Sequence, residues 1–62
     1  MRRMPVIEIS LIEGRSKEQK RALMASVTDA VERSIGAPRE TIRVILREVP
    51  AEHWAVGGVP KG

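Results

Sequence analysis

The sequence predicts an α/β (α+β) fold, a single β-α-β unit with parallel strands and a carboxyl-terminal hairpin. Residues 5–12 and 41–49 alternate between apolar and polar types, which is typical of strands with one buried face. Between them, apolar residues recur at helical spacing over about five turns. A connection of that length allows the two strands to pair in parallel with a right-handed crossover.

The first strand is expected over Pro5–Ile12, where alternate residues are apolar and face a core. Gly14 ends this strand, because glycine permits a tight reversal of the chain. The residues expected in the core are Ile7, Ile9 and Leu11.

The helix is expected to begin at Ser16, since Ser16 and Gln19 fit a capping box. Asp29 and Arg33 have the spacing of a weak surface ion pair, and Thr28 and Asp29 lie off the apolar stripe, facing water. The stripe consists of Leu23, Met24, Val27, Ala30, Val31 and Ile35.

The second strand is expected over Thr41–Val49, a segment dense in β-branched residues. Gly36 terminates the preceding helix, and residues 37–40 form a connecting turn. Gly57 and Gly58 stand between apolar residues and predict the short hairpin. One face of the strand carries Ile42, Val44 and Leu46, and the other carries Arg43, Ile45, Arg47 and Val49.

The size of the chain predicts association with further copies. Its 62 residues suffice for one domain and contain no Phe, Tyr or Cys and a single Trp. Ordering costs about 1.5 kcal/mol per residue, which burial barely offsets in so small a domain. Without disulfides, oligomerisation is the ordinary remedy. The second face of the sheet, where Ile45 and Val49 accompany arginines, is expected to meet another subunit.

Composition excludes several classes of function. No apolar run approaches the ~20 residues of a membrane span, and Glu8 interrupts any secretory apolar core, so a cytoplasmic protein is expected. The lack of Cys and the single His53 argue against a metal site. The net charge is +3, but the basic residues are dispersed along the chain, which disfavours nucleic acid as a partner.

The candidate catalytic and substrate-binding residues are Pro5, Arg15 and Arg43. In a parallel β-α-β unit, Pro5 and Arg43 both lie toward the starts of neighbouring strands. Arg15 lies at the opposite end of the first strand, so it could reach a site at Pro5 only from another subunit. Taken singly, these residues also fit structural roles, as a strand opener, a turn residue and a snorkelling strand residue. Trp54 taken alone is typical of an interface or a core.

Together these residues resemble the 4-oxalocrotonate tautomerase family, without a gap from Pro5 to about Gly58. The segments that carry the resemblance are Met4-Pro5, Glu13-Gly14-Arg15-Ser16, Glu18-Gln19-Lys20, Ser34-Ile35-Gly36-Ala37-Pro38, Ile42-Arg43-Val44-Ile45, His53-Trp54 and Gly57-Gly58. The resemblance implies a β-α-β protomer in a hexamer built as a trimer of dimers. It implies an isomerase for enol or dienol 2-hydroxy acids, such as 2-hydroxymuconate-like dicarboxylates, with no metal or organic cofactor.

The resemblance also implies roles for individual residues. The family's general base is a free amino-terminal proline nitrogen, and Pro5 has that position. Arg43 matches the arginine that binds one carboxylate and polarises the 2-oxo or hydroxyl group, and Arg15 matches the one that binds the distal carboxylate. Trp54 stands where the family has an aromatic wall, which together with the arginine charges lowers the pKa of the proline. Ile12 is expected to contact the substrate.

The chain divides into an amino-terminal extension, residues 1–4, and a tautomerase domain, residues 5–62. Within a chain the proline nitrogen is a tertiary amide and has no basic lone pair. Activity is therefore expected if translation starts at Met4 and this methionine is removed, leaving Pro5 first. With the extension retained, a non-catalytic subunit of a hetero-oligomer is the alternative. A third hypothesis is a small basic DNA-binding protein of the ribbon-helix-helix class. It is disfavoured because that fold needs a second helix where Thr41–Val49 predicts a strand.

Overall fold

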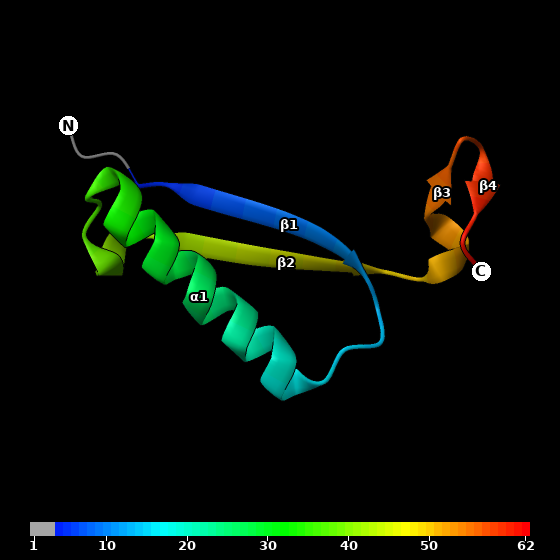
Figure 1. Cartoon of the computed structure of the whole chain (residues 1–62), viewed down its shortest axis with the longest axis horizontal. Coiled ribbons are helices and arrows are strands. Elements are labelled where there is room, and N and C mark those ends of the chain that lie inside the picture. Colours follow the sequence, from blue (N-terminus) through cyan, green and yellow to red (C-terminus); the bar gives the residue numbers. More distant parts are fainter. Residues whose placement is uncertain (1–3) are drawn as a thin grey trace.

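The computed structural model describes residues 4–62, so residues 1–3 of the predicted extension lie outside the described part of the chain. The elements follow the order β-α-β with a hairpin at the end (Figure 1). They are β1 (Val6–Ile12), α1 (Lys17–Ile35), the 3₁₀ turn η1 (Arg39–Thr41), β2 (Arg43–Val49), the 3₁₀ turn η2 (Ala51–His53), β3 (Ala55–Val56) and β4 (Val59–Pro60).

The two long strands form a parallel pair, which confirms the predicted unit. The register runs from Val6 opposite Arg43 to Ile12 opposite Val49. α1 lies across one face of this pair (Figure 1). Because β2 is a strand, and α1 is the one α-helix in the described residues, the ribbon-helix-helix alternative is wrong.

The start and end of α1 follow the local sequence signals. The Ser16 hydroxyl accepts a hydrogen bond from the Gln19 amide at 3.1 Å, and the Gln19 side chain accepts one from the Ser16 amide at 2.9 Å. This is the predicted capping box, which satisfies donors that the first helical turn leaves free. Gly36 closes the helix at φ 70°, a left-handed conformation that glycine adopts without strain.

Two predictions about the surface of α1 are wrong. Asp29 pairs with Arg39 at 2.6 Å rather than with Arg33, because the chain after the helix returns alongside it. Thr28 is half-buried rather than facing water, and its hydroxyl donates to the carbonyl of Met24 at 2.8 Å. At the other extreme, Ile35 from the predicted apolar stripe is 66% exposed in the single protomer. Ala30 from the same stripe is also exposed.

β2 begins two residues later than the predicted Thr41 start. Thr41 is buried in η1, where its amide and its hydroxyl both donate to the carbonyl of Pro38, at 3.0 Å and 2.7 Å. The Ile42 amide donates to the carbonyl of Arg39 at 3.2 Å. These turn hydrogen bonds occupy the amides of both residues, so the ladder with β1 starts only at Arg43.

The predicted hairpin is present as β3 and β4 and extends beyond the end of the sheet (Figure 1). Gly57 and Gly58 both have positive φ, 59° and 83°, which suits the two central positions of a tight hairpin turn. The hairpin returns to its own base, since the Lys61 amide donates to the carbonyl of Trp54 at 2.7 Å.

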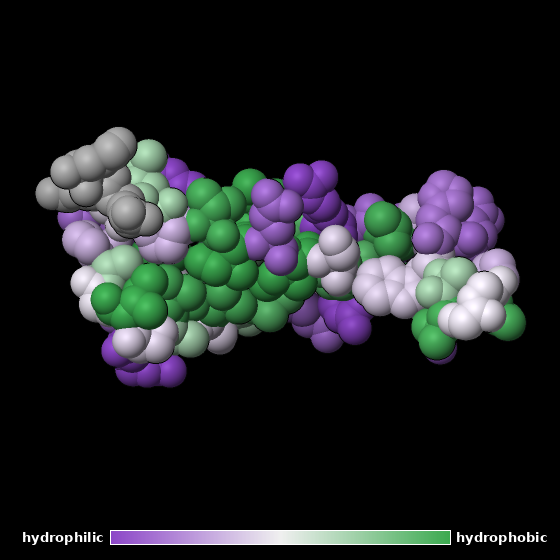
Figure 2. All heavy atoms as spheres, turned by 90° about the horizontal axis from the view of Figure 1, so that it is seen from above, coloured by the Kyte–Doolittle hydropathy of each residue, from purple (hydrophilic) through white to green (hydrophobic). Residues whose placement is uncertain are grey.

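The single protomer is more extended than its size requires. Its radius of gyration is 14.4 Å, whereas a compact domain of this length has a value of about 10.5 Å. Among residues 4–62, the buried ones are Leu11 and Thr41, at 8% and 7% exposure. Figure 2 shows hydrophobic residues gathered over the middle of the molecule, on the side where β1 lies. Such a protomer has little core of its own, which supports the predicted association.

Replacing Leu11 with alanine is expected to lower the free energy of unfolding by about 3 kcal/mol, because it removes the most buried apolar side chain. Urea unfolding at one fixed protein concentration measures this, since association adds to apparent stability. Arg33→Ala, at an exposed charged position of α1, is the control. Equal losses for the two variants would contradict the central place of Leu11.

None of the helices among residues 4–62 combines the length and the apolar character needed to cross a membrane.

Candidate functional site

Pro5 and Arg43 lie side by side where the two parallel strands begin. The Arg43 amide donates a hydrogen bond to the carbonyl of Pro5 at 3.0 Å, one step before the register pair of Val6 with Arg43. Pro5 is half-buried. Because proline offers no amide hydrogen, it flanks the ladder without leaving a donor unpaired. The parallel pairing therefore brings the predicted base and the predicted carboxylate-binding arginine to one end of the sheet.

The Arg43 guanidinium is exposed and is held on the turn that precedes its own strand. Its Nη1 donates to the carbonyl of Glu40 at 3.1 Å. A single contact of this kind leaves the remaining guanidinium donors available for a carboxylate, which arginine binds through two parallel hydrogen bonds.

Arg15, Ile12 and Trp54 lie at the other end of the strands. The Nη1 of Arg15 donates to the carbonyl of Ile12 at 3.1 Å, next to the last register pair of the sheet. Trp54 follows η2, beyond the end of β2, and is half-buried. Its amide donates to the carbonyl of Ala51 at 3.1 Å, which closes η2.

The two groups of predicted site residues are separated by the length of the sheet. Six register steps lie between Val6 and Ile12, which corresponds to about 20 Å. One substrate could not contact Pro5 and Arg15 of the same protomer across that length. The structure confirms that Arg15 lies at the opposite end of the strands from Pro5. Ile12 and Trp54 lie at the same end as Arg15, which the sequence reasoning did not address.

A shallow groove of about 370 Å³ lies between α1 and β2 and includes none of the predicted site residues. Its ion pair joins Lys20 Nζ to Glu48 Oε1 at 2.9 Å. It is lined by Lys17, Lys20, Arg21, Met24, Leu46 and Glu48. Residues 4–62 contain no group of three or more His, Asp or Glu side chains that could hold a metal ion.

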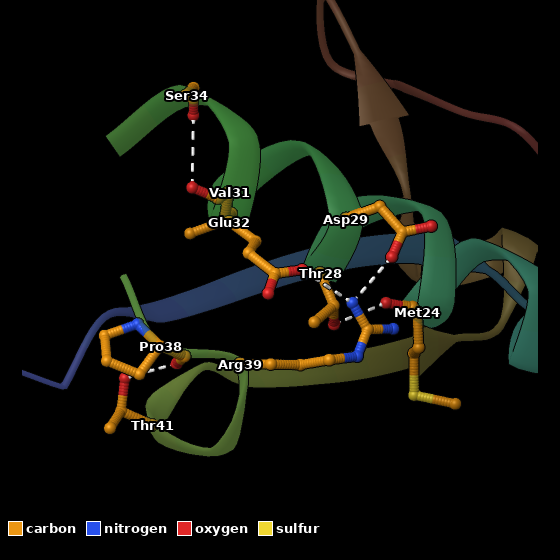
Figure 3. A network of polar contacts seen from close by, with 9 residues as sticks. All are labelled: Met24, Thr28, Asp29, Val31, Glu32, Ser34, Pro38, Arg39 and Thr41. Atoms are coloured by element: carbon orange, nitrogen blue, oxygen red, sulfur yellow. Dashed lines mark hydrogen bonds and ion pairs between the residues drawn. The ribbon is translucent and has the colours of Figure 1, made fainter. Parts of the chain in front are cut away.

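Sequence reasoning missed a cluster of charges at η1, the turn that precedes Arg43. Arg39 Nη1 contacts Asp29 Oδ1 at 2.6 Å and Glu32 Oε1 at 3.1 Å (Figure 3). The hydrogen bond that Arg39 donates to the Asp29 carboxylate, with the one it donates to Glu32, raises the pKa of Arg39 above its ordinary value. Because the pKa of Arg39 is raised in the folded state, its ion pairs with Asp29 and Glu32 are fully present below the pKa of the unfolded state. They are lost only when the pH rises through the still higher folded-state pKa. The sequence signal for this cluster was the spacing of Asp29 and Glu32, three residues apart on the helix and therefore on one face of it.

Comparison with known proteins matches a family model described as "Tautomerase enzyme" to residues 5–62. A probable tautomerase from Ralstonia nicotianae is 59% identical over 58 residues, which cover 94% of this chain and 83% of the relative. A 2-hydroxymuconate tautomerase from Pseudomonas putida is 46% identical and is matched over 92% of this chain and 90% of its own length.

The fold has solved counterparts as well. The structure of a heterohexameric 4-oxalocrotonate tautomerase from Chloroflexus aurantiacus superimposes with a TM-score of 0.91 at 38% identity, covering 94% of both chains. The chain therefore belongs to the tautomerase family.

Proposed function

We propose that this chain is an isomerase that converts enol or dienol 2-hydroxy acids, in particular 2-hydroxymuconate-like dicarboxylates, into 2-oxo acids. The observation that carries the proposal is the position of Pro5, hydrogen-bonded to Arg43 at the open end of the sheet. The proposal requires Pro5 to be the first residue of the mature chain, because only then is its nitrogen a basic amine. The relatives named as tautomerases support the reaction class.

The reaction needs one group that moves a proton and others that hold the substrate. Ketonisation removes the proton of the 2-hydroxyl group and adds a proton at carbon, so proton count and charge are conserved. The amine of Pro5 accepts and returns the proton. Arg43 binds the adjacent carboxylate and stabilises negative charge that develops on the 2-oxygen. Arg15 of another subunit binds the distal carboxylate, with Trp54 and Ile12 forming an apolar wall.

We further propose that the active assembly is a hexamer of identical chains, arranged as a trimer of dimers. The extended protomer, its small core and its exposed hydrophobic residues support association. The separation of Arg15 from Pro5 gives association a chemical purpose, because a complete site needs residues from different subunits. The heterohexameric relative supports the number of subunits.

The test uses a chain that begins at Pro5, verified by intact mass, and follows the ultraviolet absorbance of 2-hydroxymuconate as it ketonises. Turnover well above the uncatalysed rate supports the proposal. No acceleration, in a chain with a free Pro5 and an intact oligomer, would sink it.

Arg15→Ala is expected to act selectively. It should lower kcat/KM for the dicarboxylate by about 100-fold, because one charge-assisted contact is lost, while a monocarboxylate enol such as phenylenolpyruvate loses less than threefold. Steady-state kinetics with both substrates measure the difference. Equal losses for both substrates would show that Arg15 does not bind the distal carboxylate.

A second candidate function is a non-catalytic subunit of a mixed oligomer. The observation that favours it is Met4, which precedes Pro5 in this chain and blocks the nitrogen while the extension is attached. Native mass spectrometry of the protein isolated from its own host distinguishes the two: one subunit mass starting at Pro5 favours the enzyme, whereas two different subunit masses in one hexamer favour the mixed assembly.

A further inference from the structure

Arg39 joins the end of the helix to the turn that precedes Arg43. Asp29 and Glu32 lie three residues apart on one face of α1, and the Arg39 guanidinium contacts both carboxylates through Nη1 (Figure 3). A guanidinium held by two carboxylates has less freedom left than one in a single pair. The contact ties η1, which begins at Arg39, to the last turns of α1.

Hydrogen bonds within η1 and to the residues on either side of it close the turn. Thr41 is buried, and its amide and hydroxyl both bond to the carbonyl of Pro38. The Ile42 amide bonds to the carbonyl of Arg39 at 3.2 Å. Glu40 lies in the middle of this turn, so the position of its carbonyl is set by the position of the turn.

The Glu40 carbonyl is the contact that orients the Arg43 guanidinium. Arg43 Nη1 donates to it at 3.1 Å, while the Arg43 backbone is fixed independently by the Pro5 carbonyl. The direction of the Arg43 side chain thus depends on the placement of η1, and η1 is held to α1 through Arg39.

We propose that Arg39 is a positioning residue for Arg43: its ion pairs with Asp29 and Glu32 anchor η1 on α1, so that the Glu40 carbonyl holds the Arg43 guanidinium ready for a substrate carboxylate. The last clause rests on the proposed function of Arg43. The anchoring itself is a property of the fold and is measured without turnover.

Positioning is a better account of Arg39 than stability. Its side chain and those of both acids are about half exposed. Exposed ion pairs contribute little to the free energy of unfolding, because solvent screens them and ordering the side chains opposes them. A tether of this kind therefore acts mainly on which conformation η1 occupies. Its loss should show in substrate binding before it shows in the unfolding midpoint.

The experiment replaces Arg39 with alanine in the chain that begins at Pro5. KM for 2-hydroxymuconate is expected to rise about 3- to 10-fold and kcat to fall by no more than the same factor, because a loosened Arg43 guanidinium holds the carboxylate, and stabilises charge on the 2-oxygen, less well. The pH dependence of kcat should stay unchanged, because Pro5 is untouched. Arg39→Lys, which keeps the charge, should recover part of the loss. Arg33→Ala, an arginine on the last turn of the same helix, is the matched control and should change neither constant.

Nitrogen-15 relaxation of the Arg43 side chain gives a readout that does not need activity. The Arg43 Nε–H group is expected to become more mobile in Arg39→Ala and to remain as in the parent in Arg33→Ala. If the parent has no turnover but Arg43 loosens in this way, the anchoring stands and the proposed function fails. If Arg43 mobility and KM in Arg39→Ala both match the Arg33→Ala control, the positioning role is wrong whatever the reaction.

Discussion

Replacing Arg43 with alanine, in a chain that begins at Pro5, is expected to lower kcat/KM for 2-hydroxymuconate by about 100- to 1,000-fold while the oligomer stays assembled. The guanidinium is assigned two tasks, binding a carboxylate and stabilising charge on the 2-oxygen, and alanine performs neither. The fold of each subunit should survive because the backbone contact from Arg43 to Pro5 and the β1–β2 ladder do not involve the side chain.

Steady-state kinetics together with native mass spectrometry measure both halves of this prediction. Arg47→Ala is the matched control, since it removes an exposed arginine from the same strand and the same face. Arg47 lies four residues further along β2, or about 13 Å, and its ion pair is with Glu8. A rate for Arg43→Ala close to that of Arg47→Ala would remove Arg43 from the site.

The fold was predictable because its signals are local. Period-two alternation, the Ser16 capping box and the Gly57-Gly58 turn each act within a few residues, and all three appear as expected. The errors arose where distant contacts decide the outcome. Thr41 has β propensity, yet hydrogen bonds to Pro38 hold it in a turn. Such competition between propensity and tertiary context is not visible in a short window of sequence.

The candidate site was predictable in part for the same reason. Parallel pairing of two strands is enough to place Pro5 beside Arg43 and to send Arg15 to the far end. The Arg39 cluster was not predicted from the sequence, because its three members approach one another only when the turn after α1 folds back alongside the helix. The helical spacing of Asp29 and Arg33 suggested a local partner instead, and the structure shows that the longer-range partner replaces it.

The open protomer and the divided site have one cause. A sheet of two long strands with a helix on one face leaves the other face and both edges uncovered. The same strands, seven residues each, are long enough to keep Arg15 and Trp54 away from Pro5. In the proposed assembly, other copies of the chain cover these open surfaces and bring the separated residues together.

Retention of the residues before Pro5 is also expected to cause a large loss of activity. A chain that retains Met1-Arg2-Arg3-Met4 is expected to lose at least about 1,000-fold in kcat/KM relative to the chain that begins at Pro5, comparable to removing a general base together with its binding geometry. The reason is covalent: acylation by Met4 makes the Pro5 nitrogen a tertiary amide, which has no basic lone pair at any accessible pH.

Two matched proteins test this expectation, one translated from Met1 and one from Met4, with each amino terminus established by intact mass. A third protein, beginning with Ala in place of Pro5, separates loss of the base from added bulk. It has a free primary amine and no extension, so it should keep a measurable fraction of the rate if an amine is what the reaction needs. Full turnover by a chain whose mass includes Met1 would show that the nitrogen of Pro5 is not the base, and the proton would then have to move through another group near Arg43.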